Sequence, residues 1–87
     1  MAVIRKKSYP PYFEHVRNGK KRFDVRLADF DAQPGDTIIF EEYDPHTRQP
    51  TGRTSEHKIG YVLRTKDAGY WTRADIEKFG LMVMGLE

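Results

Sequence analysis

Short runs rich in strand-forming residues, separated by proline and glycine turns, restrict the possible folds of this chain more than any other feature. In the clearest run, residues 21–27, the side chains of Phe23, Val25 and Leu27 alternate with charged ones. A period of two predicts a strand that buries one face and leaves the other in solvent or in a cleft. Further short runs predict strands at residues 3–7, 37–40, 54–63 and 81–84.

Two segments predict short helices. Residues 11–18 begin at a proline, carry Phe13 and Val16 three positions apart, and end at an Asn-Gly pair. Thr72 predicts the N-cap of a second helix, which runs to a glycine at position 80. About six short strands with two short helices make an α+β, mainly β, fold class, and we expect a small mixed β-barrel.

The composition fits one folded domain over residues 1–87, because 38% of the residues are hydrophobic. The chain has no cysteine, its three histidines lack metal-ligand spacing, and it has no glycine-rich phosphate loop, so we expect no metal and no cofactor. No apolar run is long enough for a signal peptide or a membrane span. We therefore expect a cytoplasmic protein, monomeric by default, without a membrane partner.

Positive charge is concentrated at the start of the chain. The net charge is only +2, yet the first 26 residues contain eight lysines and arginines and only two acidic residues. Such a basic end indicates either a phosphate-facing surface or ordinary solvated charge.

Lys21, Asp24 and Arg26 carry the chemistry of the clearest run. Strand periodicity puts Asp24 and Arg26 on one face, and Lys21 follows the turn at Gly19. The three side chains can clamp a phosphate, with Asp24 orienting the two cations. They can also act in acid/base or nucleophilic catalysis if the site is desolvated. The simplest alternative is a salt-bridged strand face.

The segment 19–26 resembles the Gly-x-Lys-x-x-Glu-x-Arg signature of ASCH domains, which belong to the PUA-like superfamily. Gly19, Lys21 and Arg26 match, and Asp24 stands where the family usually has Glu. The hairpin residues 41–53 are also similar to a bacterial and phage ASCH-like subfamily of uncharacterised function. The resemblance implies a PUA-like β-barrel with a cleft for RNA or a modified nucleoside beside the signature strand.

One branch of this fold removes the acetyl group from N4-acetylcytidine. There, a Lys at the position of Lys21 acts with a Thr at the position of Asp24 and with a later Glu. By order along the chain, Asp75 and Glu77 are the candidates for that Glu.

Further residues are predicted to support binding. Lys20 and Arg22 flank the signature lysine, and Arg53 follows the hairpin. Tyr70 and Trp71 follow a loop-like stretch, where an exposed ring can stack on an unpaired base; the alternative is that Trp71 closes one end of the barrel.

We therefore expect an RNA- or nucleotide-binding module in which Lys21 and Arg26 contact the ligand and Asp24 holds them. One alternative is an enzyme, either a nucleoside amidohydrolase of the N4-acetylcytidine type or a single-strand ribonuclease, with Lys21 and Asp24 as acid/base residues. Another is a protein-interaction domain, which would show an apolar surface around Tyr70 and Trp71.

Overall fold

The computed structural model describes the backbone of residues 1–87 and every side chain except those of residues 67 and 68. Three strands and three short helices follow one another along the chain. They are β1 (Val3–Ser8), α1 (Tyr12–Arg17), β2 (Thr37–Asp44), β3 (Gln49–Lys58), α2 (Thr65–Ala68) and α3 (Arg73–Phe79).

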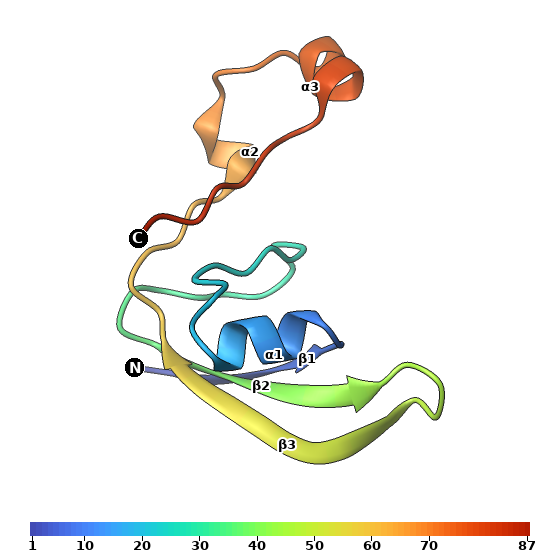
Figure 1. Ribbon diagram of the computed structural model, residues 1–87. Coiled ribbons are helices and arrows are strands. Elements are labelled where there is room, and N and C mark those ends of the chain that lie inside the picture. The colour runs from blue at the N-terminus through green and yellow to red at the C-terminus, as the bar shows by residue number, and fades with distance from the viewer.

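The strands form one open sheet of mixed direction in the order β1-β2-β3 (Figure 1). β1 pairs with β2 in parallel, from Val3 opposite Thr37 to Ser8 opposite Glu42. A parallel pair of strands needs a long crossover connection, and residues 9–36, which include α1, form it. β3 returns antiparallel to β2 through a tight hairpin, with a register irregularity between Glu41 and Tyr43.

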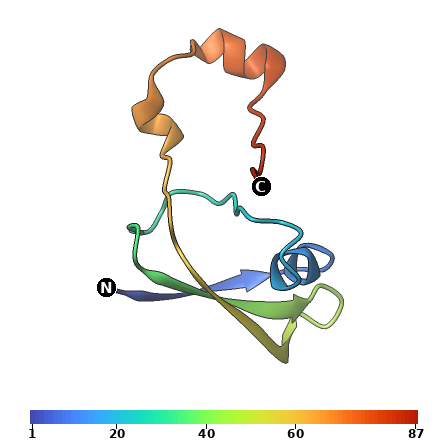
Figure 2. The ribbon, with the colours of Figure 1, turned by 60° about the vertical axis from the view of Figure 1, so that its left-hand side comes forward.

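The core is small and lies between α1 and one face of the sheet (Figure 2). Phe13 and Val16 of α1 pack against Ile38 and Phe40 of β2, and Ile59 adds a partly buried side chain. We call this covered side of the sheet the inner face. The alternating burial of β2 follows from strand periodicity, because every second side chain points at α1.

The expected β-barrel of about six strands is wrong, because the described backbone contains a three-stranded sheet that does not close. The strand predicted at residues 21–27, the end of the strand predicted at 54–63 and the strand predicted at 81–84 are wrong, because residues 21–27, 59–63 and 81–86 belong to no strand or helix. Val25 and Leu27 stay 63% and 81% exposed. The alternation at residues 21–27 therefore predicted neither a strand nor a buried face correctly.

Two carbonyl groups, one within residues 21–27 and one in β1, accept hydrogen bonds from charged side chains. Lys21 Nζ donates to the carbonyl of Phe23 at 2.9 Å, and Arg26 Nη2 donates to the carbonyl of Lys7 at 2.7 Å. These carbonyl groups are thus satisfied by side chains, and a strand ladder is not required to satisfy them.

The other expected elements are largely confirmed. β1, α1 and β2 form where predicted, and Thr72 Oγ1 accepts a hydrogen bond from the amide of Asp75 as the N-cap of α3. β3 begins at Gln49 and not near residue 54, and it tolerates Pro50 because it is an edge strand. α2 is an additional helix in a stretch predicted to be a loop.

The C-terminal part of the chain leaves the sheet after β3. α2 and α3 lie apart from the sheet in both views, and the last residues run back toward it (Figures 1 and 2). A Cβ added at Gly85 would meet the ring of Phe23 at 2.9 Å, so the C-terminal segment passes directly against that ring.

None of the described helices has the length and apolar character that crossing a bilayer requires.

The Asp36 carboxylate joins the start of β1 to the start of β2. Its Oδ1 accepts the amide N–H of Ala2 and its Oδ2 that of Gln33, both at 2.9 Å. These two bonds, with Ala2 contributing most, hold the pKa of Asp36 below its usual value of 3.8. The carbonyl of Asp36 also accepts the amide of Ile59, which follows β3.

The Asp36→Asn substitution should destabilise the protein near neutral pH, with an effect that disappears in acid. Because the folded-state pKa of Asp36 is lowered, its contribution is complete above pH 3.8 and is lost as pH falls through the folded-state value. Urea unfolding followed by circular dichroism at several pH values between about 6 and 2 measures this difference. An exposed carboxylate serves as the control in Asp29→Asn. Equal stability of wild type and Asp36→Asn at pH 6 would contradict the assignment.

Candidate functional site

Lys21, Asp24 and Arg26 come together as the sequence predicts. Arg26 Nε donates to Asp24 Oδ2 at 2.5 Å, and Lys21 Nζ lies 3.8 Å from Asp24 Oδ1. The three side chains are half-buried, at 17%, 26% and 24% exposure for Lys21, Asp24 and Arg26. One carboxylate therefore holds two cations. The preceding turn uses Gly19 at a φ of +82°, a conformation that favours glycine.

This three-residue site is fixed to three different elements. The amide of Lys21 donates to the carbonyl of His15 in α1 at 2.8 Å. Arg26 donates to the carbonyl of Lys7 in β1, and its guanidinium carbon lies 5.5 Å from the ring centroid of Phe40 in β2. The site therefore has a defined geometry even though residues 21–27 form no strand.

Aromatic rings border the same site. Lys21 Nζ lies 4.7 Å from the ring centroid of Phe23 and 6.0 Å from that of Tyr12. Both distances fall in the range of cation–π contacts. The alternation at residues 21–27 predicted a buried Phe23, and no binding role was predicted for Tyr12, but the two residues are 36% and 58% exposed.

The remaining predicted residues are distributed over the molecule. Lys20 and Arg22 are exposed on the same turn as the three-residue site. Tyr70 and Trp71 lie between α2 and α3, with ring centroids 5.8 Å apart. Trp71 borders a surface hollow of about 410 Å³ and Tyr70 another of about 340 Å³. Neither hollow is lined by the three-residue site.

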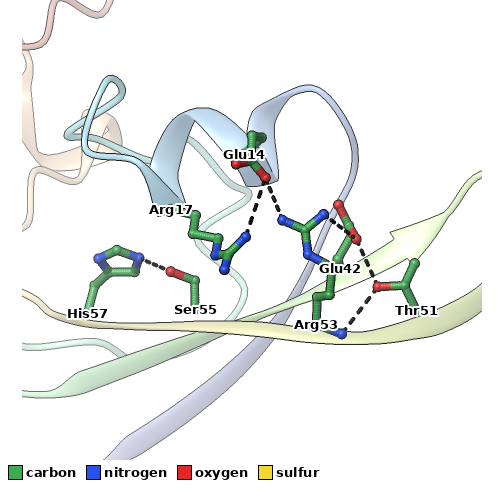
Figure 3. A network of polar contacts seen from close by, with 7 residues as sticks. All are labelled: Glu14, Arg17, Glu42, Thr51, Arg53, Ser55 and His57. Atoms are coloured by element: carbon green, nitrogen blue, oxygen red, sulfur yellow. Dashed lines mark hydrogen bonds and ion pairs between the residues drawn. The ribbon is translucent and has the colours of Figure 1, made fainter.

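Arg53 belongs to a second polar network on the inner face (Figure 3). Its guanidinium lies 2.5 Å from Glu14 Oε2 and 3.6 Å from Glu42 Oε1, and 5.2 Å from the ring centroid of Phe13. Thr51 Oγ1 donates to Glu42 at 2.8 Å. Glu42 is buried at 7% exposure, so these contacts compensate the cost of removing its charge from water. The network fastens α1 to the sheet.

A Ser-His pair lies on the same strand, and sequence reasoning did not identify it. Ser55 Oγ and His57 Nε2 share a hydrogen bond of 2.6 Å (Figure 3), and the centroid of the His57 ring lies 5.7 Å from that of Phe40. Their i, i+2 spacing on a strand was the available signal. No described carboxylate hydrogen-bonds His57, so the pair lacks the third member of a catalytic triad among the described residues.

No group of described residues has the composition and proximity to hold a metal ion.

The Arg53→Met substitution should lower the free energy of unfolding by about 2 kcal/mol, because it leaves the buried Glu42 without its cation. Methionine retains an apolar stem against Phe13, so the loss of stability measures mainly the removal of the positive charge of Arg53. Urea denaturation measures the effect, and Arg22→Met, on an exposed side chain, is the matched control. Adding Glu42→Gln to Arg53→Met should recover part of the stability. An unchanged unfolding midpoint in Arg53→Met would show that Glu42 needs no partner.

Comparison with known proteins identifies a family but no characterised relative. Residues 5–75 match the family model described as "Domain of unknown function (DUF3850)". Searches of curated proteins and of solved structures found no match. The resemblance to ASCH domains is not tested by these comparisons and stays a prediction. Because the match covers most of the chain, this protein belongs to the DUF3850 family.

Proposed function

We propose that this domain binds RNA or a nucleotide through Lys21 and Arg26, with Asp24 holding both cations in position. The observation that carries the proposal is the convergence of two cations on one half-buried carboxylate. Such a cluster keeps one net positive charge after the internal pairing. It therefore favours an anionic ligand, and a phosphate is the anion whose geometry suits a guanidinium.

The hydrogen-bonding capacity of Arg26 supports this assignment. A guanidinium carries five N–H bonds. The described partners of Arg26, Asp24 and the carbonyl of Lys7, use two of them, which leaves three without a described partner. These three can donate to phosphate oxygens without breaking the bonds that position the side chain. Arg26 would then bind the ligand in a preorganised state.

Neighbouring charges strengthen the attraction of the site for polyanions. Further basic residues lie on β1 and on the turn before the site: Arg5, Lys6, Lys7, Lys20 and Arg22. Of these residues, Arg5 forms an ion pair with Glu41 at 3.6 Å. A field of one sign raises the rate of encounter with nucleic acid and makes binding dependent on salt.

The same geometry is compatible with the enzyme alternative, in which Lys21 and Asp24 transfer protons. Asp24 is already engaged by both cations, an arrangement suited to orienting them. Assays for product from N4-acetylcytidine and from short RNA separate the two functions. Turnover that Lys21→Ala abolishes while binding is retained would establish an enzyme.

A second candidate function is a protein-interaction domain. It is favoured by the exposure of apolar side chains in the C-terminal part, including Tyr70 at 82%, Met82 at 79% and Met84 at 71%. Exposed apolar groups of this kind mark interaction surfaces. This function would leave nucleic-acid affinity unaffected by changes at Arg26.

The Arg26→Ala substitution should weaken binding of a short single-stranded RNA about tenfold at low salt. It should also reduce the slope of log affinity against log salt by about 0.7, the contribution of one phosphate contact in a single strand. Fluorescence anisotropy between 50 and 200 mM salt gives both quantities. Arg73→Ala is the matched control, since Arg73 is 95% exposed on α3 and pairs with Glu77. Wild-type affinity that does not change with salt would refute the phosphate contacts.

A further inference from the structure

Aromatic rings and cations alternate around the end of β1 and the start of α1. The ammonium of Lys21 lies between two rings, Phe23 at 4.7 Å and Tyr12 at 6.0 Å. Tyr12 is the first residue of α1 and is 58% exposed, whereas Phe23 is 36% exposed and is contacted by the C-terminal segment at Gly85. Tyr12 is therefore the ring beside the cations that remains most open to a ligand.

A second aromatic pair lies beside the side chain of Lys7. The rings of Tyr9 and Tyr43 meet edge to face with centroids 6.4 Å apart, and Lys7 Nζ lies 4.7 Å from the centroid of Tyr43. Tyr9 is 44% exposed, so this pair also offers ring surface to solvent.

We propose that the ligand is an unpaired nucleic-acid strand, with one base stacked on Tyr12. This inference rests on the proposed function, in which Lys21 and Arg26 contact phosphate. It adds that the domain selects single strands, because only an unpaired base exposes a face to a tyrosine ring. Stacking of this kind tolerates any base, so the preference is for strandedness and not for sequence.

Charge distinguishes this site from the surroundings of Tyr70. The cation in the hollow beside Tyr70 is Arg64, which pairs with Asp31 at 3.2 Å. In the three-residue site, two cations share one carboxylate. The attraction for a phosphate is therefore greater beside Tyr12 than beside Tyr70.

Anisotropy measurements with a fluorescein-labelled RNA hexamer, the same hexamer with abasic sugars, and a duplex of equal length test the inference. Wild-type protein should bind the hexamer more tightly than the abasic strand by about tenfold, the contribution of a stacked base. The duplex should bind with the weak affinity of the abasic strand. Equal affinity for all three probes would overturn the stacking.

Substitutions at Tyr12 locate the stacking. Tyr12→Ala should reduce affinity for the hexamer about tenfold and leave affinity for the abasic strand unchanged, whereas Tyr12→Phe keeps the ring and should bind as the wild type does. Tyr61→Ala is the matched control on an exposed tyrosine and should have no effect. A loss in Tyr70→Ala with none in Tyr12→Ala would place the base elsewhere and overturn the inference.

The outcomes also separate this inference from the function on which it rests. Salt-dependent binding that is lost in Arg26→Ala, with no distinction between the hexamer and the abasic strand, would retain phosphate binding and reject base stacking. Absence of binding to every probe would reject both.

Discussion

The Asp36 carboxylate is the interaction on which the positions of the other elements depend. By accepting the amides of Ala2 and Gln33, it ties the first residues of the chain to the turn that starts β2. That link is consistent with the parallel register of β1 and β2, which begins at Val3 opposite Thr37. The register in turn places the carbonyl of Lys7 where Arg26 reaches it. A structural carboxylate at one end of the sheet thus supports the geometry of the candidate site.

Two arginines cover the inner face in similar ways but have different charge surroundings. Arg26 lies over the ring of Phe40, and Arg53 over the ring of Phe13. Arg53 contacts two carboxylates, Glu14 and Glu42, so its charge is compensated within the protein. Among the described side chains, Arg26 contacts one carboxylate, that of Asp24, and shares it with Lys21, so the cluster keeps a net positive charge. The arrangement at Arg53 suits a structural role, and the arrangement at Arg26 suits the binding of an anion. The number of acidic partners, more than burial, separates the two roles.

The sequence pattern predicted the local elements better than their assembly. The N-cap at Thr72 and the strand at residues 37–40 are determined by neighbouring residues, and the structure has them where predicted. The barrel failed because alternation at residues 21–27 shows which side chains share a face but not which strand lies alongside.

The same distinction applies to the site. Lys21, Asp24 and Arg26 are close in sequence, so their convergence could be predicted from spacing. The contacts of Arg53 with Glu14 join residues 39 positions apart and depend on how α1 packs on β3. The position of Tyr12 beside Lys21 likewise depends on the path of the chain after α1. Long-range packing of this kind leaves no local pattern in the sequence.

An NMR titration of the isotopically labelled protein with the single-stranded RNA hexamer locates the bound ligand residue by residue. We expect the largest shifts on Lys21, Asp24 and Arg26 and on the ring of Tyr12, with smaller shifts at Lys7. Shifts confined to the residues between α2 and α3, or no shifts at all, would contradict a nucleic-acid site at these residues.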